Sequence, residues 1–234
     1  MFSIRIAGHD FCIENRYSYV EELCRDYIEP GTGGEHIVVT DEDMQRERIP
    51  GEDFPPSYEE STAVYRYICE KLIQEGVFLI HASAVSIDGQ GMLFAATSGT
   101  GKSTHAKLWK DVFGDRAVII NDDKPLIGVG AEGITAYGTP WSGKHCLQTN
   151  TSVPVRALFL LERCEKNSVE RVSFHEAYPK VLNQAYRPKD AVRMQKTLRM
   201  VNAFLENVPV YRLKCNISED AVWTAYSALE DDDN

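Results

Sequence analysis

Apolar and polar residues alternate at the start of the chain, as they do in half-buried β-strands. One alternating run covers residues 2–6, and a second covers residues 11–13 beyond a Gly-His-Asp turn, so we expect a β-hairpin. The pattern then changes to a helical one over residues 17–28, which Pro30 ends. A short run at residues 36–40 predicts one further strand.

This pattern stops between residues 41 and 57, where polar side chains and three prolines replace the periodic apolar positions. Such a stretch is typical of a linker. We therefore expect a small N-terminal α+β subdomain over residues 1–56 and a larger core over residues 57–234.

The core contains three segments with helix signals. Ser57 and Glu60 have the spacing of a capping box, and Gly76 is expected to end the helix that follows. The apolar face of that helix is formed by Val64, Ile68 and Leu72. A second apolar stripe follows helical spacing along residues 190–207, and Ser218 is expected to cap a last helix.

Short apolar runs lie between these helices and predict strands. They occupy residues 77–80, 84–87, 92–97, 117–120 and 157–161. The sequence Asp-Gly-Gln-Gly separates the second run from the third and indicates a hairpin. Strands that alternate with helices are typical of an α/β fold, so we expect a mixed sheet flanked by helices.

Composition is that of a globular protein and narrows the functional classes. The chain has 234 residues, and its 35 acidic against 25 basic residues give a net charge of −10, which argues against nucleic-acid binding. No run of 18 apolar residues predicts a membrane span, and the N-terminus lacks a secretory pattern. Six cysteines lie far apart without zinc-ligand spacing, so we expect reduced thiols and a cytoplasmic protein.

The strongest chemical signal is Ala-Thr-Ser-Gly-Thr-Gly-Lys-Ser at residues 96–103. It matches the phosphate-binding P-loop pattern except that Ala96 replaces the first glycine. An apolar strand precedes it and a helical pattern over residues 102–113 follows it. A glycine-rich structural turn is the alternative, but it gives no reason for Lys and Ser at the start of a helix.

The residue types of this loop suit a nucleotide. Its glycines allow backbone N–H groups to point at phosphate oxygens, and the positive end of the helix adds to the attraction. Lys102 is expected to bridge the β- and γ-phosphates, and the Ser103 hydroxyl is expected to ligate Mg²⁺. The predicted ATP-binding residues are Ser98, Gly99, Thr100, Gly101, Lys102, Ser103 and Thr104.

Two carboxylates follow the next apolar strand, about twenty residues beyond the loop. Asp122 and Asp123 come directly after Val-Ile-Ile-Asn. Strand ends of α/β sheets converge on the ligand crevice, where one carboxylate would hold Mg²⁺ and the other would take a proton from an attacking hydroxyl. A turn is the alternative interpretation, because Asn-Asp-Asp before Lys-Pro is turn composition.

These motifs, with His81 in the sequence Ile-His-Ala-Ser-Ala-Val, resemble the HPr kinase/phosphorylase family. That family shares its P-loop core with the ATP-dependent phosphoenolpyruvate carboxykinases. His81 lies fifteen residues before Ala96, where the family has a histidine, and residues 138–144 resemble a segment of the small HPr-kinase-like branch. The resemblance covers roughly residues 57–234.

The resemblance implies roles for individual residues. His81 would lie by the γ-phosphate or the acceptor, and Asp122 and Asp123 would divide the base and metal roles in an order that stays open. Lys144, which belongs to a matched motif, and Arg187 or Arg193 would supply charge to the transition state. The family often forms oligomers, which makes a homo-oligomer one possible partner arrangement.

The chain also departs from the bifunctional members of that family. Thr104 replaces the glutamate that they carry after the loop serine, and Thr-Ala-Tyr precedes Gly138 where they carry an acidic residue. Both departures argue against phosphorylase activity and against HPr as the substrate. The N-terminal segment is also short for their separate N-terminal domain.

The sequence thus favours an Mg²⁺-dependent kinase that transfers the γ-phosphoryl group of ATP to a serine-type hydroxyl of a small molecule or peptide. A nucleotide-binding regulatory module without turnover is the alternative. A carboxykinase-like enzyme fits less well, because those proteins are much longer. A GTPase fits poorly as well, because Asn-Asp-Asp-Lys does not match the guanine-binding motif.

Overall fold

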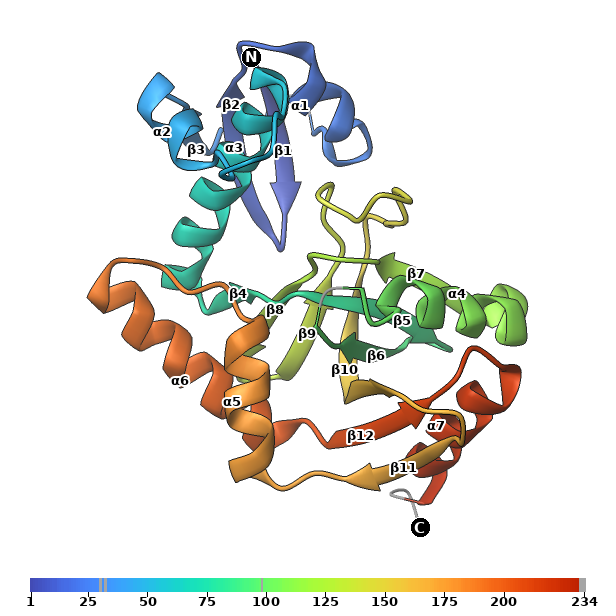
Figure 1. Cartoon of the computed structure of the whole chain (residues 1–234). Coiled ribbons are helices and arrows are strands. Elements are labelled where there is room, and N and C mark those ends of the chain that lie inside the picture. The colour runs from blue at the N-terminus through green and yellow to red at the C-terminus, as the bar shows by residue number, and fades with distance from the viewer. Residues whose placement is uncertain (30, 32, 98, 232–234) are drawn as a thin grey trace. The chain divides into compact units, whose positions relative to one another are not determined.

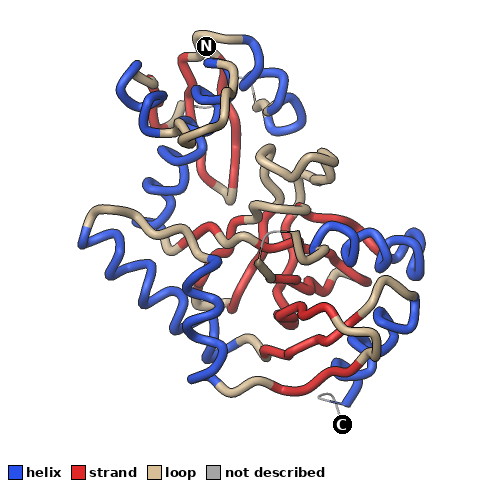
Figure 2. Tube along the Cα trace, viewed as in Figure 1, coloured by secondary structure: helices blue, strands red, loops and turns tan. Residues whose placement is uncertain are grey.

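The computed structural model describes residues 1–29, 31, 33–97 and 99–231 (Figure 1). Contacts divide the chain into two compact units, Met1–Glu75 and Gly76–Asn234. Both units mix helices with strands (Figure 2). Among the described residues, none of the helices combines the length and the apolar character needed to cross a membrane.

The first unit is built on a small three-stranded sheet of order β1-β2-β3. The expected hairpin is confirmed, because β1 and β2 pair antiparallel across a turn at Ala7 and Gly8, which both have positive φ. The helix expected over residues 17–28 is shorter and ends in a 3-10 turn. The elements of this unit are β1 (Phe2–Ile6), β2 (His9–Glu14), α1 (Ser18–Leu23), β3 (Glu35–Val38), α2 (Asp41–Arg46) and α3 (Pro56–Leu72).

The stretch expected to be a linker contains a helix. Thr40 accepts a hydrogen bond from the Asp43 N–H, and the Asp43 carboxylate accepts one from the Thr40 N–H, which forms a capping box at the start of α2. Arg66 of α3 pairs with both Asp43 and Glu47. Helix α2 is therefore held against α3 by ion pairs as well as by packing.

The start of α3 differs from the expected capping box. Pro55 is the N-cap and Pro56 the first helical residue, with no side-chain cap. The Glu60 carboxylate is fully buried and instead accepts hydrogen bonds from the backbone N–H groups of Arg16 (2.5 Å) and Tyr17 (3.1 Å). By its contacts α3 thus belongs to the first unit, whereas the sequence analysis placed it at the start of the second.

The second unit contains a nine-stranded mixed sheet. Its central strand β10 pairs with β9 through its first residues and with β6 and β12 further along. The other neighbours complete the order β4-β8-β9-β10-β6-β5-β7, with β12 and then β11 beyond β10. The strands are β4 (Val77–Leu79), β5 (Ala82–Ile87), β6 (Gln90–Ala95), β7 (Ala117–Asn121), β8 (Leu126–Gly130), β9 (Gly133–Tyr137), β10 (Ser152–Arg163), β11 (Ser168–Arg171) and β12 (Val210–Cys215).

Four helices cover this sheet. Helix α4 spans Lys102–Phe113, as expected, and it packs on β5, β6 and β7 and against α7 (Glu219–Asp231). Helix α6 (Ala191–Asn207) packs on β4, β8 and β9, and α5 (Phe174–Gln184) packs on α6. The Asp190 side chain caps α6, and the buried part of its expected stripe lies in its second half, at residues such as Val201 and Leu205.

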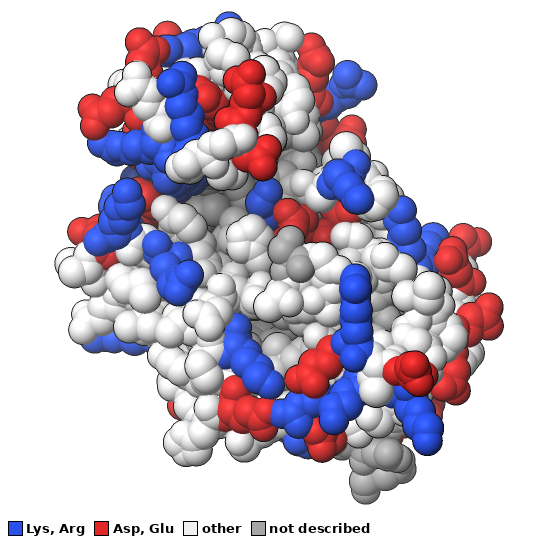
Figure 3. Space-filling view, in the orientation of Figure 1, with Lys and Arg blue, Asp and Glu red and all other residues white. Residues whose placement is uncertain are grey.

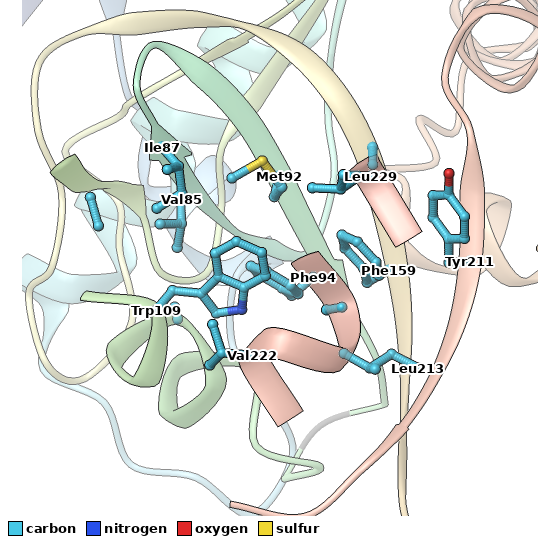
Figure 4. Packing of buried hydrophobic residues seen from close by; sticks show 14 of the residues in the cluster. Val85, Ile87, Met92, Phe94, Trp109, Phe159, Tyr211, Leu213, Val222 and Leu229 are labelled. Carbon is cyan, nitrogen blue, oxygen red and sulfur yellow. The ribbon is translucent and has the colours of Figure 1, made fainter. Parts of the chain in front are cut away.

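The core beneath α4 and α7 is rich in aromatic rings (Figure 4). Trp109 of α4 is fully buried and packs at a tilt against Phe94, whose ring is stacked on that of Phe159 at a centroid distance of 5.6 Å. The Trp109 indole N–H donates to Nε2 of the buried His105 (3.0 Å), so the indole has its hydrogen-bond partner inside the core. This core positions the first turn of α4 and the loop before it.

Candidate functional site

The sheet brings several chain segments to one edge. Strands β6, β10 and β12 run parallel, and β5 runs antiparallel to both β6 and β7. The carboxyl ends of β6, β7, β10 and β12 therefore lie at the same edge as the amino end of β5 (Figure 1). Ligands of α/β proteins bind at such an edge. We call it the carboxyl edge.

Residues 96–103 form the turn from β6 into α4. Gly99 and Gly101 have φ of +78° and +115°, a region that glycine adopts without strain. Gly101 is the N-cap of α4, and no side chain in the described part of the chain caps the helix, so its first backbone N–H groups keep their hydrogen-bonding capacity. Lys102 Nζ donates to the Ala96 carbonyl (3.2 Å), which closes the turn. Ser98 lies outside the described residues.

A guanidinium group from β10 also holds this loop, and the sequence analysis missed it. Arg163 Nε donates to the Thr100 carbonyl (3.1 Å), and a terminal nitrogen of the same group donates to the Gly99 carbonyl. Both carbonyls are thereby turned toward β10. No local pattern marks Arg163, because its position depends on the pairing of β10 with β6.

Asn121 shapes the turn that carries the two aspartates. Its side-chain oxygen accepts from the backbone N–H groups of Asp123 (2.8 Å) and Lys124 (2.6 Å). Its amide donates to the carbonyls of Thr139 (3.0 Å) and Trp141 (3.2 Å). The turn interpretation is therefore right as a description of the backbone. The same turn also ties the aspartates to residues 138–144, the other segment singled out in the sequence.

Asp122 is fully buried, and its two carboxylate oxygens differ in their hydrogen bonding. Its Oδ1 accepts from the Gly143 N–H (2.6 Å), while its buried Oδ2 has no hydrogen-bond partner among the described residues. Burial raises the pKa of Asp122, the Gly143 hydrogen bond opposes that rise, and Asp123 adds to it. A Cβ at Gly143 would lie 3.0 Å from Oδ2, so a larger residue there would require the Asp122 carboxylate to shift by a few tenths of an ångström.

Two hydroxyl groups link the Asp122 backbone to neighbouring elements. Ser103 Oγ, in the first turn of α4, donates to the Asp122 carbonyl (3.3 Å), and Ser83 Oγ of β5 donates to the same oxygen (2.7 Å). Of the three residues expected to hold Mg²⁺, Ser103 is therefore brought next to the turn that carries Asp122 and Asp123. Within the described residues, no group of three or more His, Cys, Asp or Glu side chains is arranged to hold a metal ion.

Asp123, Lys102 and His81 form the other side of the site. Asp123 is half-buried, and its Oδ2 lies 3.3 Å from Lys124 Nζ. The Ala82 N–H donates to the Asp123 carbonyl, which brings the amino end of β5 next to the aspartate turn. Although His81 is an exposed residue, the protein packed around its ring lowers its pKa, Asp123 opposes this change, and Lys124 and Lys102 reinforce it.

The remaining predicted residues lie elsewhere or are exposed. Thr104 and Lys144 are exposed, and Lys144 follows Gly143 in the segment that contacts Asp122. Arg187 is exposed beyond α5, where it donates to Asn183, and Arg193 belongs to the first turns of α6. A residue that the sequence analysis did not single out, His145, contributes positive charge that lowers the pKa of Asp122.

Two cavities border loop 96–103. The larger, of about 610 Å³, lies between α4 and the ends of β10 and β12, and we call it the α4 cavity. Its lining includes Gly101, Leu108, Leu161, Cys164, Cys215 and Ile217. The smaller, of about 300 Å³, lies against α5, and we call it the α5 cavity. Its lining includes Ala96, Thr97, Glu162, Lys180, Asn183 and Gln184.

Comparisons with known proteins show a family and a distant similarity to solved structures. A family model described as SynChlorMet cassette protein ScmC matches residues 60–225. The HPr(Ser) kinase/phosphatase from Coxiella burnetii is similar in structure, with a TM-score of 0.38 and 12% sequence identity. That similarity covers 66% of this chain and 94% of the other. No curated protein matches the sequence significantly.

Proposed function

The chain belongs to the SynChlorMet cassette protein ScmC family, and we propose that it is a kinase that transfers the γ-phosphoryl group of ATP to a hydroxyl. One observation carries the proposal: a glycine turn with Lys102 and Ser103 at a helix start lies beside an aspartate turn at the carboxyl edge. Phosphoryl transfer needs this combination of phosphate cradle, metal ligands and base more than it needs covalent chemistry.

The loop and the α4 cavity suit a nucleotide. The open amino end of α4, Lys102 and the backbone turn at Gly99 and Gly101 provide N–H donors and positive charge for phosphates. The α4 cavity continues from the same residues and has apolar lining, with a volume inside the usual range of about 300–1,000 Å³ for ligand pockets. We assign it to the nucleoside.

The donor set fits Mg²⁺. The ion prefers oxygen ligands, keeps several waters, and uses one or two carboxylates together with substrate phosphates. Asp122 supplies a buried carboxylate oxygen that has no partner among the described residues, and the Ser103 hydroxyl lies next to the same turn. When bound, the ion would neutralise charge on the β- and γ-phosphates.

The two aspartates differ in access, which suggests how they divide the work. Asp122 is closed off from solvent, which suits a metal ligand, whereas Asp123 is half-exposed beside His81. We assign Asp123 as the group that accepts the proton of the acceptor hydroxyl. The ring of His81 would orient that hydroxyl, and Lys102 would stabilise the transferred phosphoryl group.

The test is ³¹P NMR of the protein with Mg·ATP and a low-mass extract of host cells. We expect a new phosphomonoester signal with the wild type and with Lys107→Ala, a control on the same helix, and no such signal with Lys102→Ala. Calorimetry with Mg·ADP should show that Lys102→Ala weakens binding at least tenfold. Binding without transfer to any acceptor would favour the regulatory module, and absence of nucleotide binding would refute the assignment of the loop.

A further inference from the structure

The α5 cavity opens on the other side of the sheet from the α4 cavity, which is assigned to the nucleotide, although Leu161 and Glu162 line both. Phe94 and Phe159 pack beneath α4, and side chains alternate along a strand. The next residues, Ala95 and Leu160, therefore face the other side of the sheet, and both line the α5 cavity. This cavity reaches the carboxyl edge at Thr97, whereas the α4 cavity reaches it at Thr100.

We propose that the α5 cavity binds the phosphoacceptor and that this acceptor is a small zwitterion with a hydroxyl group, an amino acid of the serine type. The inference rests on the proposed function and names the substrate class of the same site. It follows from the charge, the size and the connections of the cavity.

The cavity lining carries both signs of charge. Lys180 Nζ lies 3.8 Å from Glu162 Oε1, and both residues line the cavity. Each also has a further partner, because Glu176 lies 3.1 Å from Lys180 and Arg212 lies 3.2 Å from Glu162. Basic and acidic side chains are interleaved over α5, β11 and β12 on the face shown in Figure 3. The cavity therefore presents a cation and an anion a few ångströms apart.

A zwitterion matches this pair better than an ion of one sign. Its carboxylate would approach Lys180 and the amides of Asn183 and Gln184, and its ammonium group would approach Glu162. An acceptor with only one charge would lie against a side chain of its own sign as well as one of the opposite sign. Gln184 has no side-chain hydrogen bond among the described residues, so its amide is available.

Backbone hydrogen bonds connect the cavity to the reacting groups. The His81 N–H donates to the Gln184 carbonyl (2.8 Å), and the Tyr186 N–H donates to the Leu79 carbonyl (2.9 Å). The end of α5 is thus fixed to the segment that carries His81. An acceptor in this cavity would place its hydroxyl between Thr97 of the loop and His81, where the proposed transfer takes place.

The size of the cavity favours a free metabolite. Its volume of about 300 Å³ is at the lower end of the range for ligand pockets. Such a space holds a small molecule. A peptide would present its serine without free ammonium and carboxylate groups, and Glu162 and Lys180 would then have no role in its recognition.

The first experiment is an acceptor panel with Mg·ATP. L-Serine is compared with 3-hydroxypropionate, which lacks the ammonium group, with ethanolamine, which lacks the carboxylate, and with N-acetylserine amide, which lacks both charges. We expect kcat/KM to fall at least tenfold for each omission. Equal or better use of N-acetylserine amide, or of a serine peptide, would overturn the inference while leaving the proposed kinase activity in place.

The second experiment separates binding from turnover. Saturation-transfer NMR measures L-serine binding to the protein with Mg·ADP, and we expect binding to the wild type and its loss in Lys180→Met and Glu162→Gln. Lys189→Met and Glu132→Gln, at exposed positions outside the cavity, are the matched controls and should bind normally. Binding without phosphoryl transfer would support the cavity and refute the kinase. Binding that is absent, or unchanged in Lys180→Met, would refute the cavity assignment.

Discussion

Replacement of Asp122 by asparagine is expected to make the second unit more stable while it abolishes phosphoryl transfer. The side chain is fully buried, and its Oδ1 accepts the Gly143 N–H at 2.6 Å. Its Oδ2 has no hydrogen-bond partner among the described residues. Asparagine has the same shape and can keep the bond to Gly143, so Asp122→Asn removes charge without creating a cavity.

The magnitude follows from the unpaired oxygen. A buried polar atom without a partner costs about 1–3 kcal/mol, and a charged one costs more. The new amide nitrogen would be equally unpaired, so only the part of the penalty due to charge is recovered. We expect a gain of about 1–2 kcal/mol in the free energy of unfolding at pH 7.5, or about 2–8 °C in Tm for a unit of this size.

Tryptophan fluorescence can measure this gain in the second unit alone. All three tryptophans, Trp109, Trp141 and Trp223, belong to that unit. Urea titrations are run in EDTA without nucleotide, so that ligand binding adds nothing to the apparent stability. Asp123→Asn is the matched control. Because Asp123 is half-exposed and paired with Lys124, we expect its replacement to lower stability by at most about 1 kcal/mol.

The pH dependence gives the sharper test. Folding raises the pKa of the Asp122 carboxyl group, so ionisation of this group destabilises the folded state. The destabilisation develops as pH rises through the folded pKa, and it is absent below the unfolded pKa of about 4. The advantage of Asp122→Asn over the wild type should therefore be largest at neutral pH and shrink in acid. An Asp122→Asn protein less stable than the wild type at pH 7.5 would refute the reasoning.

Three further predictions concern His105, Cys164 and Glu60. Burial lowers the pKa of His105 to about 4, so the stability of the metal-free second unit should fall by about 3 kcal/mol as pH drops from 6.5 to 4. His105→Gln, which can still accept from Trp109, should flatten that dependence in tryptophan-monitored urea titrations. Mg·ADP should slow alkylation of the exposed Cys164, which lines the α4 cavity, but not of Cys12 in the other unit, as peptide mass spectrometry would show. Glu60→Ala should speed hydrogen exchange at the backbone N–H groups of Arg16 and Tyr17 by tenfold or more, because both donate to the Glu60 carboxylate. The tryptophan-monitored unfolding of the second unit should be unchanged.

Local signals succeeded where a few adjacent residues determine the backbone. The Asp88-Gly89 turn between β5 and β6 has positive φ at both residues, which is the conformation that this dipeptide favours. Helix α4 begins at Lys102 and ends at Phe113 as expected, because glycines precede and follow it. In both cases the information lies within a few positions of the element it determines.

The same kind of signal was wrong where a distant partner competed for the side chain. Ser57 and Glu60 have capping-box spacing, yet Glu60 satisfies two backbone N–H groups more than forty residues earlier in the chain. The proline pair before α3 was the better local guide, since proline is well suited to the first helical position. Spacing alone does not reveal whether a carboxylate bonds to its own helix or to another segment.

The candidate site also combines residues set by local sequence with residues set by distant contacts. Its reacting groups lie in short contiguous motifs, because a phosphate cradle and an aspartate turn each need neighbouring residues with particular backbone angles. Lys180, which is proposed to bind the acceptor together with Glu162, comes from α5. Glu162 and Arg163 lie at the end of β10 and come near loop 96–103 only through the parallel pairing of β6 with β10. That pairing depends on the order of strands in the sheet, which no local pattern encodes. The sequence therefore predicts the proposed reaction chemistry, whereas the proposed substrate choice depends on residues whose proximity appears only in the fold.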